Sequence, residues 1–120
     1  MAIVGLGTCD DGGHVVFELH GELDVAGAAS VIAVLTAAAA GNPQIVVDLA
    51  ALEYIDCYSL GELGRVRAQA RQAGGDLLLA APRGLVRRLL DLTGLIGVFA
   101  VHASVPDACG APVRLGGLLR

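Results

Sequence analysis

The sequence predicts a single α/β domain built on a mixed, mostly parallel sheet of about 4–5 strands with about 4 helices. Short runs of β-branched and apolar residues alternate with longer segments in which apolar residues recur every three or four positions. Helices between strands predict parallel pairing through right-handed crossovers. The turn signal Asp10-Asp11-Gly12-Gly13 predicts an N-terminal antiparallel hairpin, and 120 residues fit one domain, 1–120.

The first elements follow from local signals. Residues 2–9 and His14–His20, which reads "HVVFELH", make the predicted hairpin. "GELD", Gly21–Asp24, then interrupts the chain, and Asp24 is a predicted N-cap for an Ala-rich helix that runs from Val25 to about Ala40. The helix face that we expect to be apolar carries Val25, Ala28 or Ala29, Ile32, Leu35 or Thr36, and Ala39.

A second strand and helix follow. "QIVVDL", Gln44–Leu49, predicts a short buried strand, residues 50–54 are expected to form a loop, and a helix then begins near Asp56 and ends at Gly74-Gly75. The later elements are a strand at Asp76–Ala81, a helix at about Leu85–Thr93 stopped by Gly94, a strand at Val98–His102, and a short helix with a loose tail in 103–120.

Composition excludes several classes of function. The net charge is −4; nine of the twelve acids lie in residues 1–62, and every cation is an Arg in residues 63–120. Without a clustered basic run, no nucleic acid is expected as a partner. The lack of Lys excludes a Walker-type phosphate loop and a Schiff-base enzyme. A chain start without the charged and apolar segments of a secretory signal predicts a cytoplasmic protein.

Cysteines, histidines and one uncharged stretch give further limits. Cys9, Cys57 and Cys109 are odd in number and far apart, which favours reduced thiols. The Cys and His residues show no Cys-x-x-Cys or His-x-x-x-His spacing, so we predict no metal and no other cofactor. The uncharged Val25–Val47 has the length of a membrane span, but Asn42-Pro43-Gln44 breaks it, so no membrane span is predicted.

The candidate site lies in "LEYIDCYSLGELG", Leu52–Gly64. Asp56 can cap the helix that begins here, and Ser59, three residues before Glu62, matches a capping box and competes for that role. A helix N-terminus can also hold a phosphorylated hydroxyl, whose charge would expel a bound partner. Asp24 falls at the same predicted edge, outside the carboxyl ends of the strands, where α/β sheets gather function.

Several blocks of sequence resemble the STAS domain family, specifically the bacterial anti-sigma factor antagonists. They are the strand followed by "GELD", then "YIDCYSLGEL" and "GGDLLLAAPRGLVRRLLDLTGLIGVF", and they cover a core of about residues 13–102. The resemblance implies a STAS-like fold and a protein-interaction module without enzymatic activity. Its implied partner is an anti-sigma factor with a serine-kinase-type ATPase domain, whose binding would release a sigma factor, with a phosphatase as a further partner.

The helix-opening motif departs from the family pattern. In the family it is typically Asp-Ser-Ser-Gly-Leu, or a variant with Cys in second place, and the third residue is the phosphorylated serine. Asp56, Cys57 and Leu60 match, whereas Tyr58 stands at the phosphoserine position and Ser59 at that of a small residue. One position along a helix rotates a side chain by roughly 100°. Three versions stay open: phosphorylation of Ser59 after a local shift, modification of Tyr58, or loss of the switch.

The residues predicted to bind the partner are Asp24, Asp56, Cys57, Tyr58, Ser59 and Leu60. By resemblance, Asp24 borders the surface that contacts the kinase-type anti-sigma factor. The arginines at 65, 67, 71, 83, 87 and 88 are interpreted as solvated helix faces and not as a docking site.

Two alternative functions stay open. The same fold could act as an adaptor in another signalling or transport assembly, with Tyr58 and Leu60 as contact anchors. Cys57 at a helix start could be the nucleophile of an enzyme, although the sequence gives no link between it and the three histidines. A response-regulator receiver is disfavoured, because receivers carry a Lys after a late strand and this chain has none.

Overall fold

The computed structural model describes residues 2–8, 13–41 and 44–110. Its elements are β1 (Ala2–Thr8), β2 (Val15–Leu23), α1 (Val25–Gly41), β3 (Gln44–Ile55), α2 (Cys57–Gln72), β4 (Asp76–Ala80), α3 (Gly84–Thr93), the 3-10 turn η1 (Leu95–Gly97), β5 (Ala100–His102) and α4 (Val105–Cys109). Three predicted features lie outside the described residues: the turn at 10–12, residues 42–43 that interrupt the uncharged stretch, and the tail at 111–120.

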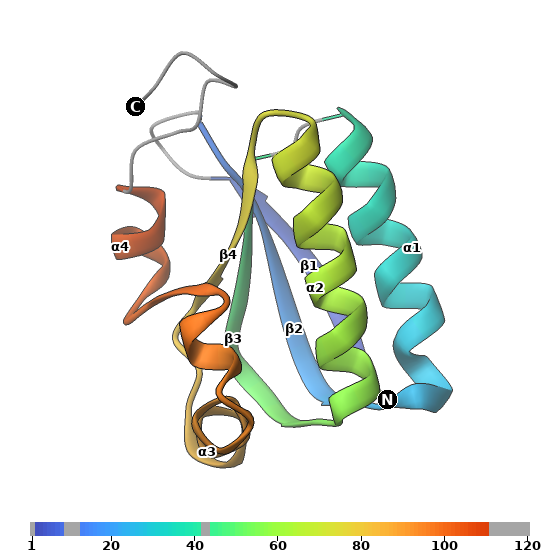
Figure 1. Ribbon diagram of the computed structural model, residues 1–120, viewed down its shortest axis with the longest axis vertical. Helices are drawn as coiled ribbons and strands as arrows, with labels where there is room; N and C mark the ends of the chain where they lie inside the picture. Colours follow the sequence, from blue (N-terminus) through green and yellow to red (C-terminus); the bar gives the residue numbers. More distant parts are fainter. Residues whose placement is uncertain (1, 9–12, 42–43, 111–120) are drawn as a thin grey trace.

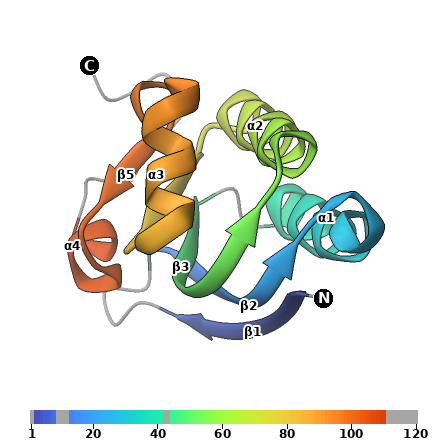
Figure 2. The ribbon, with the colours of Figure 1, turned by 90° about the horizontal axis from the view of Figure 1, so that it is seen from below.

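The strands form one sheet in the order β1-β2-β3-β4-β5. β1 pairs antiparallel with β2, and β2 to β5 are parallel neighbours. Helices α1, α2 and α3 lie on one face of this sheet, whereas α4 lies on the other side (Figure 1, Figure 2). The predicted α/β class is therefore confirmed.

Alternation along the strands sorts the apolar side chains into two cores. Phe17 and Leu19 of β2 lie with Val47 of β3 in the larger core, beneath α1, α2 and α3. Val16 and Val46 point to the opposite face, where they pack with Ala108 of α4 in the smaller core, as do Leu78 and Ala80 of β4. Apart from Phe17 and Phe99 in the larger core, Leu, Val, Ile and Ala make up the buried apolar residues of both cores.

Two strands are longer than predicted, and this places the candidate site. The expected loop at 50–54 is wrong, because β3 continues to Ile55 and pairs with β2 up to Leu23. Two register shifts, between Glu18 and His20 and between Gly21 and Glu22, absorb the extra residues of β3. Pairing with a neighbour thus outweighs the weak strand propensity of Ala and Glu in this segment.

Local signals explain how the later elements begin and end. Gly94 ends α3 with a φ of 75°, a backbone conformation that favours glycine. Residues 95–97 form η1, so β5 begins at Ala100, later than predicted.

Asp76, at the start of β4, forms ion pairs with two arginines of α2. Its carboxylate lies 3.2 Å from Arg67 Nε and 3.0 Å from Arg71 Nη1. The Arg67 contact is an ion pair without well-directed hydrogen-bond geometry.

One expectation about cysteines is corrected. Cys57 is free and exposed, but Cys109 at the end of α4 is disulfide-bonded. Cysteine spacing carries no information on contacts that only the fold creates, which is why reduced thiols were expected. Among the described helices, none has both the length and the hydropathy needed to cross a membrane.

Candidate functional site

The candidate site lies where β2 and β3 end side by side. Leu23 and Ile55, the last residues of these parallel strands, are register partners, so α1 and α2 begin at the same edge of the sheet (Figure 2). The segments that lead from β2 to α1 and from β3 to α2 are called the first and second crossing. The backbone N–H of Asp56 donates to the carbonyl of Leu23 at 3.1 Å, which links the two crossings. Asp24 and Asp56, one residue further along each crossing, are therefore neighbours in space.

Asp56 caps both helices with one carboxylate. Its Oδ1 accepts from the N–H of Ser59 in the first turn of α2, at 2.8 Å. Its Oδ2 accepts from the N–H of Val25, the first residue of α1, at 2.9 Å. The sequence predicted the first bond, and the structure identifies Asp56 and not Ser59 as the N-cap of α2. The second bond joins residues 31 positions apart.

Asp24 caps one helix, α1, as predicted. Its Oδ1 accepts from the N–H groups of Ala26 and Gly27 at 3.1 and 3.2 Å. Both helix starts thus carry an acid whose charge also suits the positive end of the helix dipole.

The protonation of Asp56 follows from these contacts. Partial burial raises the pKa of its carboxyl group, but the side chain and the N–H of Ser59 and the N–H of Val25 lower it by more, so the pKa lies below the ordinary 3.8. At neutral pH the group is therefore a carboxylate with both oxygens available as acceptors.

Exposure divides the predicted partner-binding residues. Cys57 and Tyr58 are exposed, and Tyr58, in the first turn of α2, is 55% exposed. Leu60 is only 2% exposed and belongs to the larger core, so it supports the helix from beneath and offers no contact surface.

Ser59 is fully buried. Its exposure is 0%, and its Oγ has no hydrogen-bond partner of good geometry among the described residues, although the Ser59 side chain lies close enough to Asp56 to help lower the pKa of that carboxyl group. The position follows from helix periodicity, because Ser59 lies on the same buried face as Leu63, Val66 and Ala70. A kinase cannot reach this hydroxyl while the first turn of α2 is intact.

Sequence reasoning missed one exposed residue of this edge. Val25 was expected on the apolar face of α1, yet it is 63% exposed, and the buried face carries Val31 together with Ala28, Leu35 and Ala39. Val25 is the first residue of α1, directly after its N-cap Asp24, and Cys57, the first residue of α2, is likewise exposed. Asp24, Val25, Asp56, Cys57 and Tyr58 are called the docking rim below.

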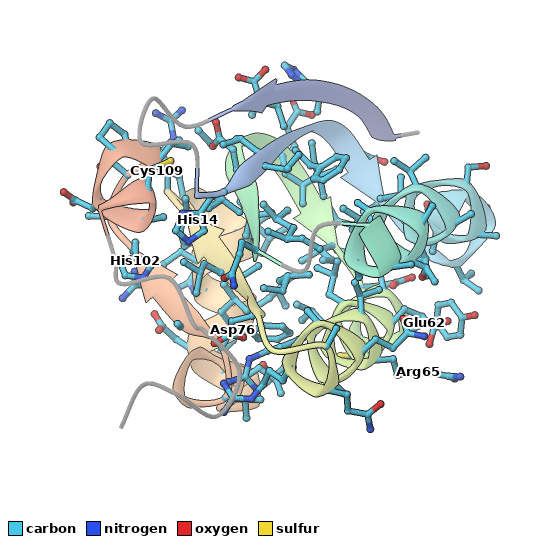
Figure 3. All side chains as sticks on the ribbon, turned by 90° about the horizontal axis from the view of Figure 1, so that it is seen from above. His14, Glu62, Arg65, Asp76, His102 and Cys109 are labelled. Carbon is cyan, nitrogen blue, oxygen red and sulfur yellow. The ribbon has the colours of Figure 1, made fainter. Side chains whose placement is uncertain are left out.

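The surroundings of the α2 start bear on catalysis and metal binding. The described residues contain no group of three or more His, Cys, Asp or Glu side chains that could hold a metal ion. His14, His102 and Cys109 lie toward α4, on the other side of the sheet from Glu62 and Arg65 of α2 (Figure 3). His14 and His102 are thus not placed beside the α2 start to activate Cys57 as a nucleophile, and His20 of β2 is half exposed, with its Nε2 3.6 Å from Glu18 Oε1.

The family model of the STAS domain matches residues 9–108. BtrV from Bordetella bronchiseptica, named as an anti-sigma factor antagonist, is 32% identical over 71 residues, which cover 59% of this chain and 61% of that relative. The match therefore spans about three fifths of the relative.

Solved structures agree with this assignment. The crystal structure of an anti-sigma factor antagonist from Mycobacterium paratuberculosis has 26% identity, a TM-score of 0.74, and a match over 90% of this chain and 91% of that one. An antagonist-like protein from Thermotoga maritima has 24% identity and a TM-score of 0.78 over 88% and 90% of the two chains, a likeness of fold. Since the family model covers most of the sequence, the chain belongs to the STAS domain family.

Proposed function

We propose that this domain is an anti-sigma factor antagonist. Through the docking rim it binds an anti-sigma factor with a serine-kinase-type ATPase domain, and the sigma factor is released in the cytoplasm. The observation that carries the proposal is the exposure of Tyr58, 55% free at the start of α2 in a chain of the STAS family. An exposed aromatic residue on a rigid helix start suits a docking anchor.

The charge of the rim defines the chemistry of the partner. Asp24 and Asp56 flank the apolar groups of Val25 and Tyr58, and residues 1–62 contain no Lys or Arg. A complementary partner face has an apolar hollow bordered by basic side chains. No reaction is assigned to the rim.

Burial argues against a serine switch at Ser59. We propose that the domain docks constitutively, because the Ser59 hydroxyl is 0% exposed and no serine stands at position 58. Phosphorylation of Tyr58 is then the remaining form that a phosphorylation switch could take, and a phosphatase would be a partner only in that case.

A comparison of two proteins tests the switch. The purified kinase-type domain and ATP are incubated with the wild-type domain and with the Tyr58→Ser variant, and intact masses are measured. We expect no phosphate on the wild type and one phosphate on the variant, whose serine is exposed at the position used by the family. A phosphate on wild-type Ser59 would refute constitutive docking, and one on Tyr58 would establish the tyrosine version.

Binding is tested with the same kinase-type domain by calorimetry. Tyr58→Ala should weaken binding by about tenfold or more, which is roughly 1.4 kcal/mol. Val98→Ala is the matched control, because Val98 is comparably exposed, at 50%, but lies beyond α3. Equal affinities for wild type and Tyr58→Ala would remove the docking rim from the mechanism. If the wild-type domain does not bind the kinase-type domain at all, the adaptor role is favoured.

A further inference from the structure

The starts of α1 and α2 share a single acid. We infer that Asp56 is a positioning residue, whose carboxylate holds Val25 of α1 and Tyr58 of α2 in one fixed arrangement, so that the docking rim forms as a unit. The consequence for docking rests on the proposed function. The joining of the two helix starts does not, and it can be measured in the free domain.

The geometry requires both oxygens of one side chain. Oδ1 receives the Ser59 N–H at 2.8 Å and Oδ2 receives the Val25 N–H at 2.9 Å. These distances are typical of charge-assisted hydrogen bonds, which are stronger than neutral ones. Because the carboxyl group is planar and rigid, the two N–H groups are held at a set separation. The side chain of Val25 and the neighbouring side chain of Tyr58 are held with them.

The backbone reinforces the same connection. The N–H of Asp56 donates to the carbonyl of Leu23 at 3.1 Å, so Asp56 contacts the first crossing through both main chain and side chain. Asp24 differs, since its two acceptor bonds go to Ala26 and Gly27 of its own helix. Loss of Asp24 therefore loosens α1 alone, whereas loss of Asp56 loosens both helix starts.

Side-chain chemistry explains why an amide is a poor substitute. Asn caps helices as well as Asp does, so Asp56→Asn can keep its oxygen on the Ser59 N–H. Its other polar atom is then an NH₂ group, which donates and cannot accept from the Val25 N–H. The variant thus keeps the cap of α2 and removes the bond to α1.

Amide hydrogen exchange in the free domain tests the joining of the helices. In Asp56→Ala, the Val25 and Ser59 amides should both exchange about tenfold faster or more; in Asp56→Asn, the acceleration should be confined to Val25. Asp24→Ala is the matched control, in which Ala26 and Gly27 exchange faster and Ser59 does not. Unchanged exchange of Val25 in Asp56→Ala would overturn the inference.

Affinity for the purified kinase-type domain tests the consequence for docking. Asp56→Asn should weaken binding about tenfold, while Gly94→Ala, which strains the end of another helix, α3, should not. This contrast separates positioning from a general loss of stability. If Tyr58→Ala weakens binding and Asp56→Asn does not, the positioning role is wrong although the proposed function holds. If neither does, the proposed function fails, and the exchange data still decide the joining of the helices.

Discussion

The buried hydroxyl of Ser59 gives a sharp test of the structure. The Ser59→Ala variant removes an Oγ that is 0% exposed and has no hydrogen-bond partner among the described residues. An unsatisfied buried polar group costs about 1–3 kcal/mol, and Ala has a helix propensity better than Ser by roughly 0.5 kcal/mol. After allowance for the lost packing of one oxygen, we expect the free energy of unfolding to rise by about 1–2 kcal/mol.

Urea unfolding at pH 7, followed by circular dichroism, measures this change. The midpoint should rise at an unchanged m-value, and Tm should rise by about 4–8 °C. Cys57→Ala is the matched control, since Cys57 lies two residues earlier in the same turn but is exposed, and its replacement should change stability by less than about 0.5 kcal/mol. A Ser59→Ala domain that is no more stable than this control would show that the hydroxyl is satisfied.

Three further predictions concern stability. The pKa of Asp56 is lowered in the folded domain, so its carboxylate stabilises the fold above the unfolded-state pKa of about 3.9 and stops doing so as the pH falls through the folded value. The gap in urea stability between wild type and Asp56→Asn should therefore close in acid, and a gap that stays constant from pH 7 to pH 2 would contradict this. Asp76→Ala should cost about 1–2 kcal/mol, because it strips the partner from Arg67, whose side chain is only 22% exposed. Asp91→Ala, which breaks a pair with Arg87 between half-exposed side chains, should cost less than about 0.5 kcal/mol, and similar losses in the two variants would contradict the role of burial. Gly94→Ala should destabilise the domain by about 1 kcal/mol, because the backbone φ of Gly94 is 75°. Gly97→Ala should cost less, because Gly97 has open space around it and no positive φ. Thermal unfolding compares the two variants, and equal Tm values would show that the φ of Gly94 does not matter.

Periodicity and turn signals predicted most of the fold. Alternating strands and helices were enough to indicate parallel crossovers, and Asp24, Asp56 and Gly94 marked helix ends correctly. The extension of β3 to Ile55 was missed because it depends on pairing with β2, which local propensity does not contain. Val25 was expected to be buried because it is apolar, although it stands at the very start of the helix, and the structure shows it exposed.

The candidate site was predicted in part. Ser59 could have been recognised as buried, because its spacing to Leu63, Val66 and Ala70 continues the apolar face of α2. Its hydroxyl was instead given a functional meaning. The bond from Val25 to Asp56 was beyond prediction, since it spans 31 positions and exists only where β2 and β3 end together.

The two kinds of residue on the docking rim differ in how freely they can change. Asp56 satisfies N–H groups of two helices at once, so its replacement disturbs the backbone on which every other rim residue stands. Tyr58 projects from that backbone into solvent and is 55% exposed, so a change there should alter recognition at little cost to the fold. A change at position 58 is therefore compatible with the fold, and under the proposed function it leaves the backbone of the docking rim in place. In this chain Tyr58 stands two residues after Asp56, which holds that backbone.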